Sequence, residues 1–104
     1  MYNSDMFDLE LYKDEIALIC KRFGIKKLEF FGSVLSEEFG EHSDIDCLIT
    51  FDESDGNYFH RYFDLKYALE ELLGRDVDIV VDSAIKNPYF RMAVDRSRQL
   101  VYAA

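Results

Sequence analysis

The chain has 104 residues, and we expect it to form one domain over residues 1–104. Apolar residues make up 49% of it, which is enough for a hydrophobic core, and its formal net charge is −9. This charge argues against direct nucleic-acid binding, because proteins that bind phosphate backbones carry a basic surface. Neither a signal peptide nor an apolar run of about 18 residues is seen, so we expect a cytoplasmic protein without a membrane segment.

Helices and strands are expected to alternate along the chain. Apolar residues at steps of three and four predict helices, and short apolar runs predict strands. In chain order we expect a helix at 9–23, a strand at 28–31, a short helix at 34–39, a strand at 44–51, a helix at 58–72, a strand at 77–81, a helix at 88–97 and a strand at 100–102. This order predicts an α/β (α+β) domain in which helices pack against one small mixed sheet.

Several residues indicate where the helices begin and end. Asp8 is the expected N-cap of the first helix, and Gly24 and Gly74 are expected to stop the two long helices. Asn87 followed by Pro88 predicts an N-cap and a proline in the first helical position.

Cys20 and Cys47 lie within apolar patterns, and we expect both to be reduced thiols in the core. A zinc site would need clustered Cys and His, and His42 and His60 lie far from both cysteines in the sequence. Four aromatic residues are expected to lie in the core and on the surface of the helix at 58–72: Phe59, Tyr62, Phe63 and Tyr67. The alternatives are a base-stacking platform and an exposed patch for a partner.

The most informative motif is Gly32-Ser33, followed by ten residues and then Asp44-Ile45-Asp46. Residues i and i+2 of a strand project to the same face, so Asp44 and Asp46 are expected to point into one site. Paired carboxylates repel each other, and divalent cations between them remove that cost. The Gly32-Ser33 turn offers backbone N–H groups and a hydroxyl, which suit a phosphate.

Asp78 is the third candidate ligand. It lies in the apolar run Val77–Val81, where a lone carboxylate would be costly to bury. If this strand lies beside the strand of Asp46, Asp78 reaches the same metal ions. The alternative is an exposed edge strand with solvated acids, which suits Asp76 and Asp82 well.

This set of residues predicts metal-assisted phosphoryl or nucleotidyl transfer. Two Mg²⁺ ions held by Asp44 and Asp46 would bind the phosphates of a nucleotide and promote in-line displacement at the α-phosphate. Asp78 would hold the metal nearer the nucleophile and accept its proton. Gly32 would let the backbone approach the phosphates, and Ser33 would hydrogen-bond them.

The spaced motif, with Asp78 in Gly-Arg-Asp-Val-Asp-Ile-Val, resembles the nucleotidyltransferase superfamily that includes DNA polymerase β. The length and the ending from Lys86 to Ala103 resemble its minimal nucleotidyltransferase (MNT) group. The resemblance implies the polymerase β-like fold, with Gly32 and Ser33 as the phosphate-binding pair and Asp44, Asp46 and Asp78 as the metal-binding acids. It also implies ATP as substrate and a helical HEPN toxin as partner, to whose tyrosine AMP is transferred.

The leading hypothesis is therefore a magnesium- and ATP-dependent nucleotidyltransferase that acts as the antitoxin of a HEPN protein. One alternative is a non-catalytic module that neutralises its partner by contact. Another is transfer to a small molecule, with a helical partner subunit completing the site. Nucleotide turnover separates the first hypothesis from the contact-only alternative.

Overall fold

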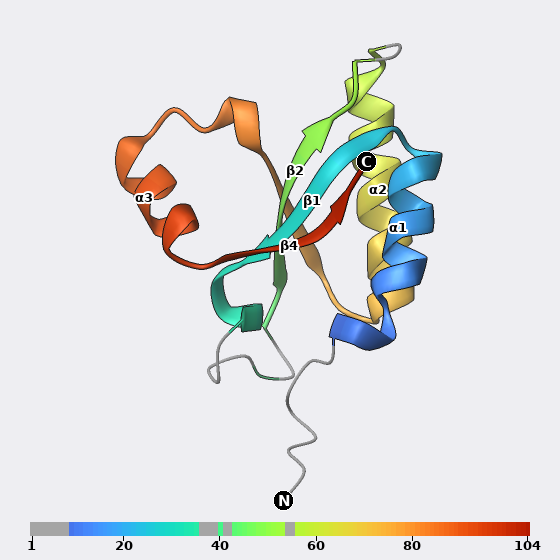
Figure 1. Ribbon diagram of the computed structural model, residues 1–104, viewed down its shortest axis with the longest axis horizontal. Coiled ribbons are helices and arrows are strands. Elements are labelled where there is room, and N and C mark those ends of the chain that lie inside the picture. The colour runs from blue at the N-terminus through green and yellow to red at the C-terminus, as the bar shows by residue number, and fades with distance from the viewer. Residues whose placement is uncertain (1–8, 36–39, 41–42, 54–55) are drawn as a thin grey trace, which may run out of the picture.

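A four-stranded sheet separates two layers of helices (Figure 1). The structure is a computed structural model that describes residues 9–35, 40, 43–53 and 56–104. Its helices and strands, in chain order, are α1 (Lys13–Arg22), β1 (Ile25–Phe31), β2 (Ile45–Phe51), α2 (Tyr58–Leu73), β3 (Val77–Val81), α3 (Pro88–Arg96) and β4 (Arg98–Ala103). Short 3-10 helices occur at η1 (Leu9–Leu11), η2 (Gly32–Leu35) and η3 (Asp82–Ala84). The predicted alternation of helices and strands is confirmed.

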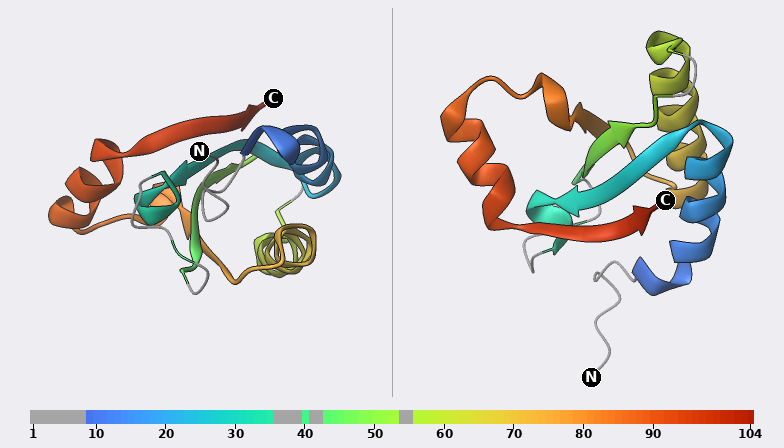
Figure 2. Two further views of the ribbon diagram at one scale, coloured as in Figure 1. Left: turned by 90° about the horizontal axis from the view of Figure 1, so that it is seen from below. Right: turned by 45° about the horizontal axis from the view of Figure 1, so that its top comes forward.

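The sheet is mixed, as predicted, with the strand order β3-β2-β1-β4. β1 pairs antiparallel with β2 and β4, whereas β2 and β3 are parallel and are joined through α2. Helices α1 and α2 cover one face of the sheet, and α3 lies on the other side (Figures 1 and 2). Within the described residues, no helix combines the length and the apolar character needed to cross a membrane.

The main hydrophobic core lies between the sheet and the α1–α2 layer. Ile45, Cys47 and Ile49 of β2 are all fully buried in it, as the strand pattern predicts. A smaller cluster on the other face joins Phe31 and Leu48 to Val94 of α3. The middle of β2 is therefore covered on both faces.

Several boundaries differ from the prediction. The first helix is divided into η1 and α1, β1 begins at Ile25, and β2 begins one residue after Asp44. Pairing of Ile25 with Phe51 explains the longer β1, because a strand extends as far as its neighbour offers partners. A short helix was expected at 34–39. Its residues 34 and 35 lie in η2, and residues 36–39 lie outside the described residues. Asp8 and His42 also lie outside the described residues.

The predicted helix ends are confirmed wherever the structure describes them. Gly24 and Gly74 have φ values of +69° and +66°, which favour glycine. The Asn87 side chain accepts hydrogen bonds from the backbone N–H groups of Tyr89 and Phe90, as an N-cap does.

Helix α2 buries an arginine that the apolar pattern did not predict. Arg61 is 8% exposed, and it donates to the carbonyl oxygens of Phe23 and Gly56 and to the carboxylate of Asp52. Its guanidinium also lies against the rings of Phe51 and Tyr58. This arginine joins the start of α2 to the turn before β1, so its role is structural.

The aromatic residues of α2 divide between the two environments that we expected. Phe59 and Tyr67 are 71% and 60% exposed, whereas Tyr62 and Phe63 are half-buried. Phe63 contacts both exposed rings, with centroids 5.0 and 6.1 Å away. An aromatic row therefore runs along the outer surface of α2.

We predict that both cysteines react slowly with a thiol reagent in the native protein. Both are free and fully buried, and burial raises the pKa of the Cys20 thiol to about 12 and that of Cys47 further. Since the thiolate is the reactive form, labelling should need global or local unfolding. Labelling followed by mass spectrometry, with and without denaturant, measures this. Rapid native labelling would contradict the core assignment.

Candidate active site

Sheet pairing brings two of the three predicted acids together. Asp46 of β2 and Asp78 of β3 are register partners in the parallel pair. Partners in neighbouring strands project to the same face, which here is the face opposite α1 and α2. Asp44 lies two residues before Asp46 and is exposed, as is Asp78, whereas Asp46 is half-buried. β3 is an edge strand, as the alternative interpretation expected, and it also lies beside β2.

The environment of Asp46 disfavours its negative charge. Burial raises the pKa of Asp46 above its ordinary value, and the charges of Asp78 and Asp44 raise it further. Among the described residues, those that act on the carboxyl of Asp46 thus raise the cost of its negative charge. A bound cation would remove this cost.

The chemistry of the donors suits a hard divalent cation. All three candidates are carboxylates, the ligands that Mg²⁺ prefers, and the raised pKa of Asp46 shows that positive charge would be favoured beside it. Within the described part of the chain, no three acidic, His or Cys side chains already converge on one point as metal ligands. The acids thus fit such an ion by type and charge, and their side chains would have to turn toward it.

The Gly32-Ser33 turn lies directly against Asp46. It follows Phe31, the register partner of Asp46, at the end of β1. Gly32 has a φ of +76°, and a Cβ atom placed on it would lie 2.7 Å from Oδ2 of Asp46. Glycine is therefore required here both by the backbone conformation and by the close approach of the carboxylate.

Ser97 is a neighbour of this turn that the sequence did not predict. The backbone N–H of Gly32 donates to Oγ of Ser97, at 3.2 Å, although the two residues are 65 positions apart. No local pattern marks such a contact. It connects the residue that ends α3 to the predicted phosphate-binding turn.

Helix α2 holds the strand of Asp78 from its free edge. Tyr62 Oη donates to the carbonyl oxygen of Ile79, at 3.0 Å, and Lys66 Nζ donates to that of Val77. Glu70 Oε2 accepts from the backbone N–H of Val77, at 3.0 Å. The residues on either side of Asp78 are thus fixed by side chains that the strand pattern did not indicate.

Arg75 holds the segment that leads to Asp44. Its guanidinium donates to the carbonyl oxygens of Gly40 and Ser43, at 2.5 and 3.1 Å. Ser43 directly precedes Asp44, so this contact limits where Asp44 can lie.

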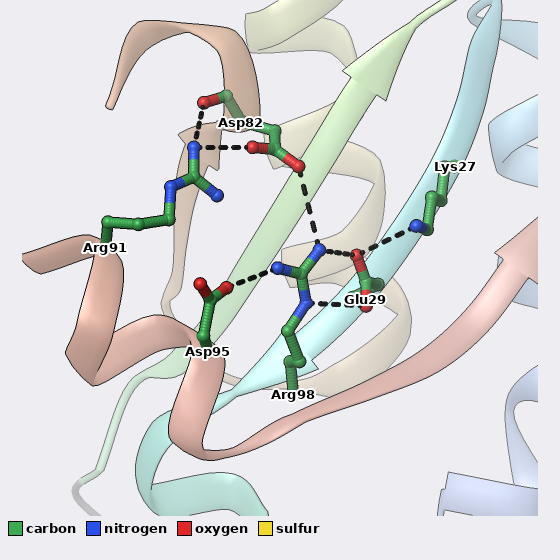
Figure 3. Close-up of polar contacts among 6 residues, drawn as sticks. All are labelled: Lys27, Glu29, Asp82, Arg91, Asp95 and Arg98. Atoms are coloured by element: carbon green, nitrogen blue, oxygen red, sulfur yellow. Dashed lines mark hydrogen bonds and ion pairs between the residues drawn. The ribbon is translucent and has the colours of Figure 1, made fainter. Parts of the chain in front are cut away.

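An ion-pair network joins α3 to the sheet (Figure 3). Arg98 of β4 donates through Nε and Nη2 to the two carboxylate oxygens of Glu29 on β1, at 3.0 and 2.6 Å, and through Nη1 to Asp95 of α3. Arg91 of α3 pairs with Asp82, at 2.7 Å. The alternative interpretation treated Asp82 as a solvated acid of the edge strand. The chain instead turns into η3 at this residue, and Arg91 and Arg98 both pair with its carboxylate.

We predict that Glu29→Gln lowers the free energy of unfolding by about 3 kcal/mol at neutral pH. Glu29 is buried, and hydrogen bonds from Arg98 hold the pKa of its carboxyl below the ordinary value despite burial. The stabilisation is present above about 4.3, the pKa of the Glu29 carboxyl in the unfolded chain. It is lost as the pH falls through the lower pKa that this carboxyl has in the folded protein. Denaturant titrations at neutral pH and at about pH 3 measure this. An equal loss at both pH values would contradict it.

Sequence comparison places the chain among nucleotidyltransferases. Residues 13–101 match the family model of the nucleotidyltransferase domain. The protein adenylyltransferase MntA of Thermococcus cleftensis is 34% identical over 82 residues, which are 79% of this chain and 78% of MntA. A solved protein provisionally assigned as a minimal nucleotidyltransferase is 35% identical, with a TM-score of 0.72 over 89% of this chain and 95% of its own.

Two solved toxin–antitoxin structures share the fold, each at 18% identity. One is the tri-AMPylated Shewanella oneidensis HEPN toxin in complex with an MNT antitoxin, with a TM-score of 0.64 over 93% of this chain and 74% of that chain. The other is a toxin–antitoxin structure with AMP-PNP, with a TM-score of 0.68 over 88% of this chain and 73% of that chain. With the family match and the mixed sheet, these results establish that the chain belongs to the nucleotidyltransferase domain family as a minimal nucleotidyltransferase (MNT), an enzyme with the polymerase β-like fold.

Proposed function

We propose that this enzyme transfers AMP from ATP to a tyrosine hydroxyl of a HEPN-type partner protein and thereby acts as its antitoxin. The observation that carries the proposal is the pairing of Asp46 with Asp78 beside Gly32. The protein adenylyltransferase activity in the name of a relative supports AMP as the transferred group, and the AMP-PNP-containing relative supports ATP as its source. The AMPylated HEPN toxin in a structural relative supports the class of partner.

In this proposal Asp44, Asp46 and Asp78 hold two Mg²⁺ ions. When bound, the ions neutralise the charge of the triphosphate and stabilise the charge that develops in the displacement. The half-buried position of Asp46 suits this role, because its charge is costly until a cation is present.

The remaining steps belong to the side chains and backbone of the chain. Gly32 lets the carboxylate of Asp46 lie directly against the turn. In the proposal, Ser33 hydrogen-bonds a phosphate oxygen. Asp78 accepts the proton of the acceptor hydroxyl. That oxygen then forms a bond to the α-phosphorus, the bond from the α-phosphorus to the bridging oxygen breaks, and pyrophosphate leaves.

The charge of the chain favours a basic partner. At −9, the chain attracts proteins of opposite net charge at long range. Docking of such a protein would also place its hydroxyl in line with the α-phosphate.

The test is incubation of the chain with its cognate HEPN-type protein, ATP and Mg²⁺, followed by intact-mass spectrometry. We expect the partner to gain one or more AMP units, and Asp44→Ala with Asp46→Ala to prevent this. Asp64→Ala with Glu71→Ala is the matched control, because it removes two exposed carboxylates from α2, on the other side of the sheet. An unchanged partner mass with toxicity still neutralised would show that the chain acts by contact alone.

A further inference from the structure

The outer face of α3 is exposed and largely apolar. Tyr89, Met92, Ala93 and Arg96 recur at i, i+3, i+4 and i+7, and all four are exposed. Tyr89 is 80% exposed and Met92 is 55% exposed. We call these four residues the α3 platform. Large apolar side chains gathered on one exposed face indicate an interaction surface.

The platform lies on the side of the sheet that carries the acids. Among the described helices, α1 and α2 lie on one side of the sheet, and α3 lies on the other (Figures 1 and 2). Asp46 and Asp78 project to the side of α3, because their strand neighbours Ile45, Cys47, Val77 and Ile79 are buried in the core under α1 and α2. The segment that contains α3 begins at Asp82, four residues after Asp78, and ends at Ser97, which accepts a hydrogen bond from Gly32. Both ends of this segment therefore meet elements of the candidate active site.

Helix α3 is fixed to the sheet by its inner face. Val94 is fully buried against Phe31 and Leu48. The Arg91–Asp82 and Asp95–Arg98 ion pairs join the helix to the end of β3 and to β4 (Figure 3). The inner residues thus hold α3 on the sheet, and the platform residues remain exposed. A helix that is already held in place binds a partner with a smaller loss of backbone conformational entropy than a segment that must fold on binding.

The charge of the platform is opposite to that of the whole chain. Arg96 in the platform is an exposed cation, as is Lys86 just before α3, and the carboxylate of Asp95 is bound to Arg98. The outer face of α2 shows the reverse pattern, because its exposed aromatic residues Phe59 and Tyr67 lie among the exposed acids Asp64 and Glu71. Charge complementarity therefore predicts an apolar surface flanked by carboxylates as the occupant of the platform.

We propose that the α3 platform docks the acceptor protein, through an apolar patch with neighbouring Asp or Glu side chains close to the hydroxyl that receives AMP. The identification of the docked protein as the acceptor of AMP rests on the proposed function. Net charge attracts the partner at long range, and the platform determines which part of the partner faces Asp46 and Asp78.

The test compares two pairs of substitutions in the full chain. Tyr89→Ser with Met92→Ser should raise the Kd for the partner and the KM for it as a substrate by about 30-fold, as loss of a central aromatic contact does. ATP binding with Mg²⁺ and the melting temperature should stay unchanged. Phe59→Ser with Tyr67→Ser removes two large apolar side chains of similar exposure from α2 and should leave Kd and KM unchanged. Arg96→Glu should also raise both constants.

The outcomes separate this inference from the proposed function. An unchanged Kd in the α3 variant would overturn the docking inference, whether or not AMP is transferred. Loss of binding only in the α2 variant would place the docking surface on α2 and would also overturn it. A weakened Kd in the α3 variant, with no AMP added by the unaltered chain, would support docking on α3 and refute the proposed transfer.

Discussion

Asp46→Asn is expected to abolish nucleotidyl transfer, lowering the rate by about 10³-fold or more. Asp46 lies next to Asp78 across the β2–β3 pair and next to Gly32, so it is central to the candidate site. The amide keeps the shape of the side chain and removes the negative charge that would hold a cation.

The same substitution is expected to raise the melting temperature of the metal-free protein. The pKa of Asp46 is raised by burial and by Asp78 and Asp44, so the ionised carboxyl destabilises the fold. This destabilisation is complete above the pKa that Asp46 has in the folded protein, and it is absent below the pKa that Asp46 has in the unfolded chain. The gain in melting temperature should therefore be largest at neutral pH and should shrink as the solution is acidified.

Intact-mass spectrometry measures the transfer, and calorimetric melting at several pH values without metal measures the stability. A variant that is much less stable than the unaltered protein at neutral pH would show that Asp46 has a structural role. Transfer at the normal rate would remove Asp46 from the proposed mechanism.

Gly32→Ala is expected to lower transfer by about 10²-fold. The new Cβ would lie 2.7 Å from Oδ2 of Asp46, so the carboxylate must move away from its place beside Asp78. The backbone adds a cost of about 1–2 kcal/mol, since φ is +76° and alanine disfavours that region.

Gly74→Ala is the matched control for this prediction. Gly74 has a φ of +66°, and a Cβ there would meet no atom within 4 Å. Both variants should lose similar stability from the backbone, and only Gly32→Ala should lose transfer. Equal transfer rates in the two variants would show that contact with Asp46 at Gly32 has no part in the reaction.

The order of the elements could be predicted from the sequence because its signals are local. The apolar residues of α1 and α2, the glycines at 24 and 74 and the Asn87 cap act within a few residues of themselves. The buried state of Cys20 and Cys47 also follows from local patterns. The spaced motif and Asp78 indicated the candidate site, and they did so by residue type and spacing.

Only the tertiary structure decided how these residues meet. The register that pairs Asp46 with Asp78 depends on β3 adding to β2 in parallel, and a strand pattern alone is compatible with other neighbours. The Gly32–Ser97 and Glu29–Arg98 contacts join residues 65 and 69 positions apart. A polar side chain carries no sequence signal of its distant partner, because folding brings the two together through the burial of other residues.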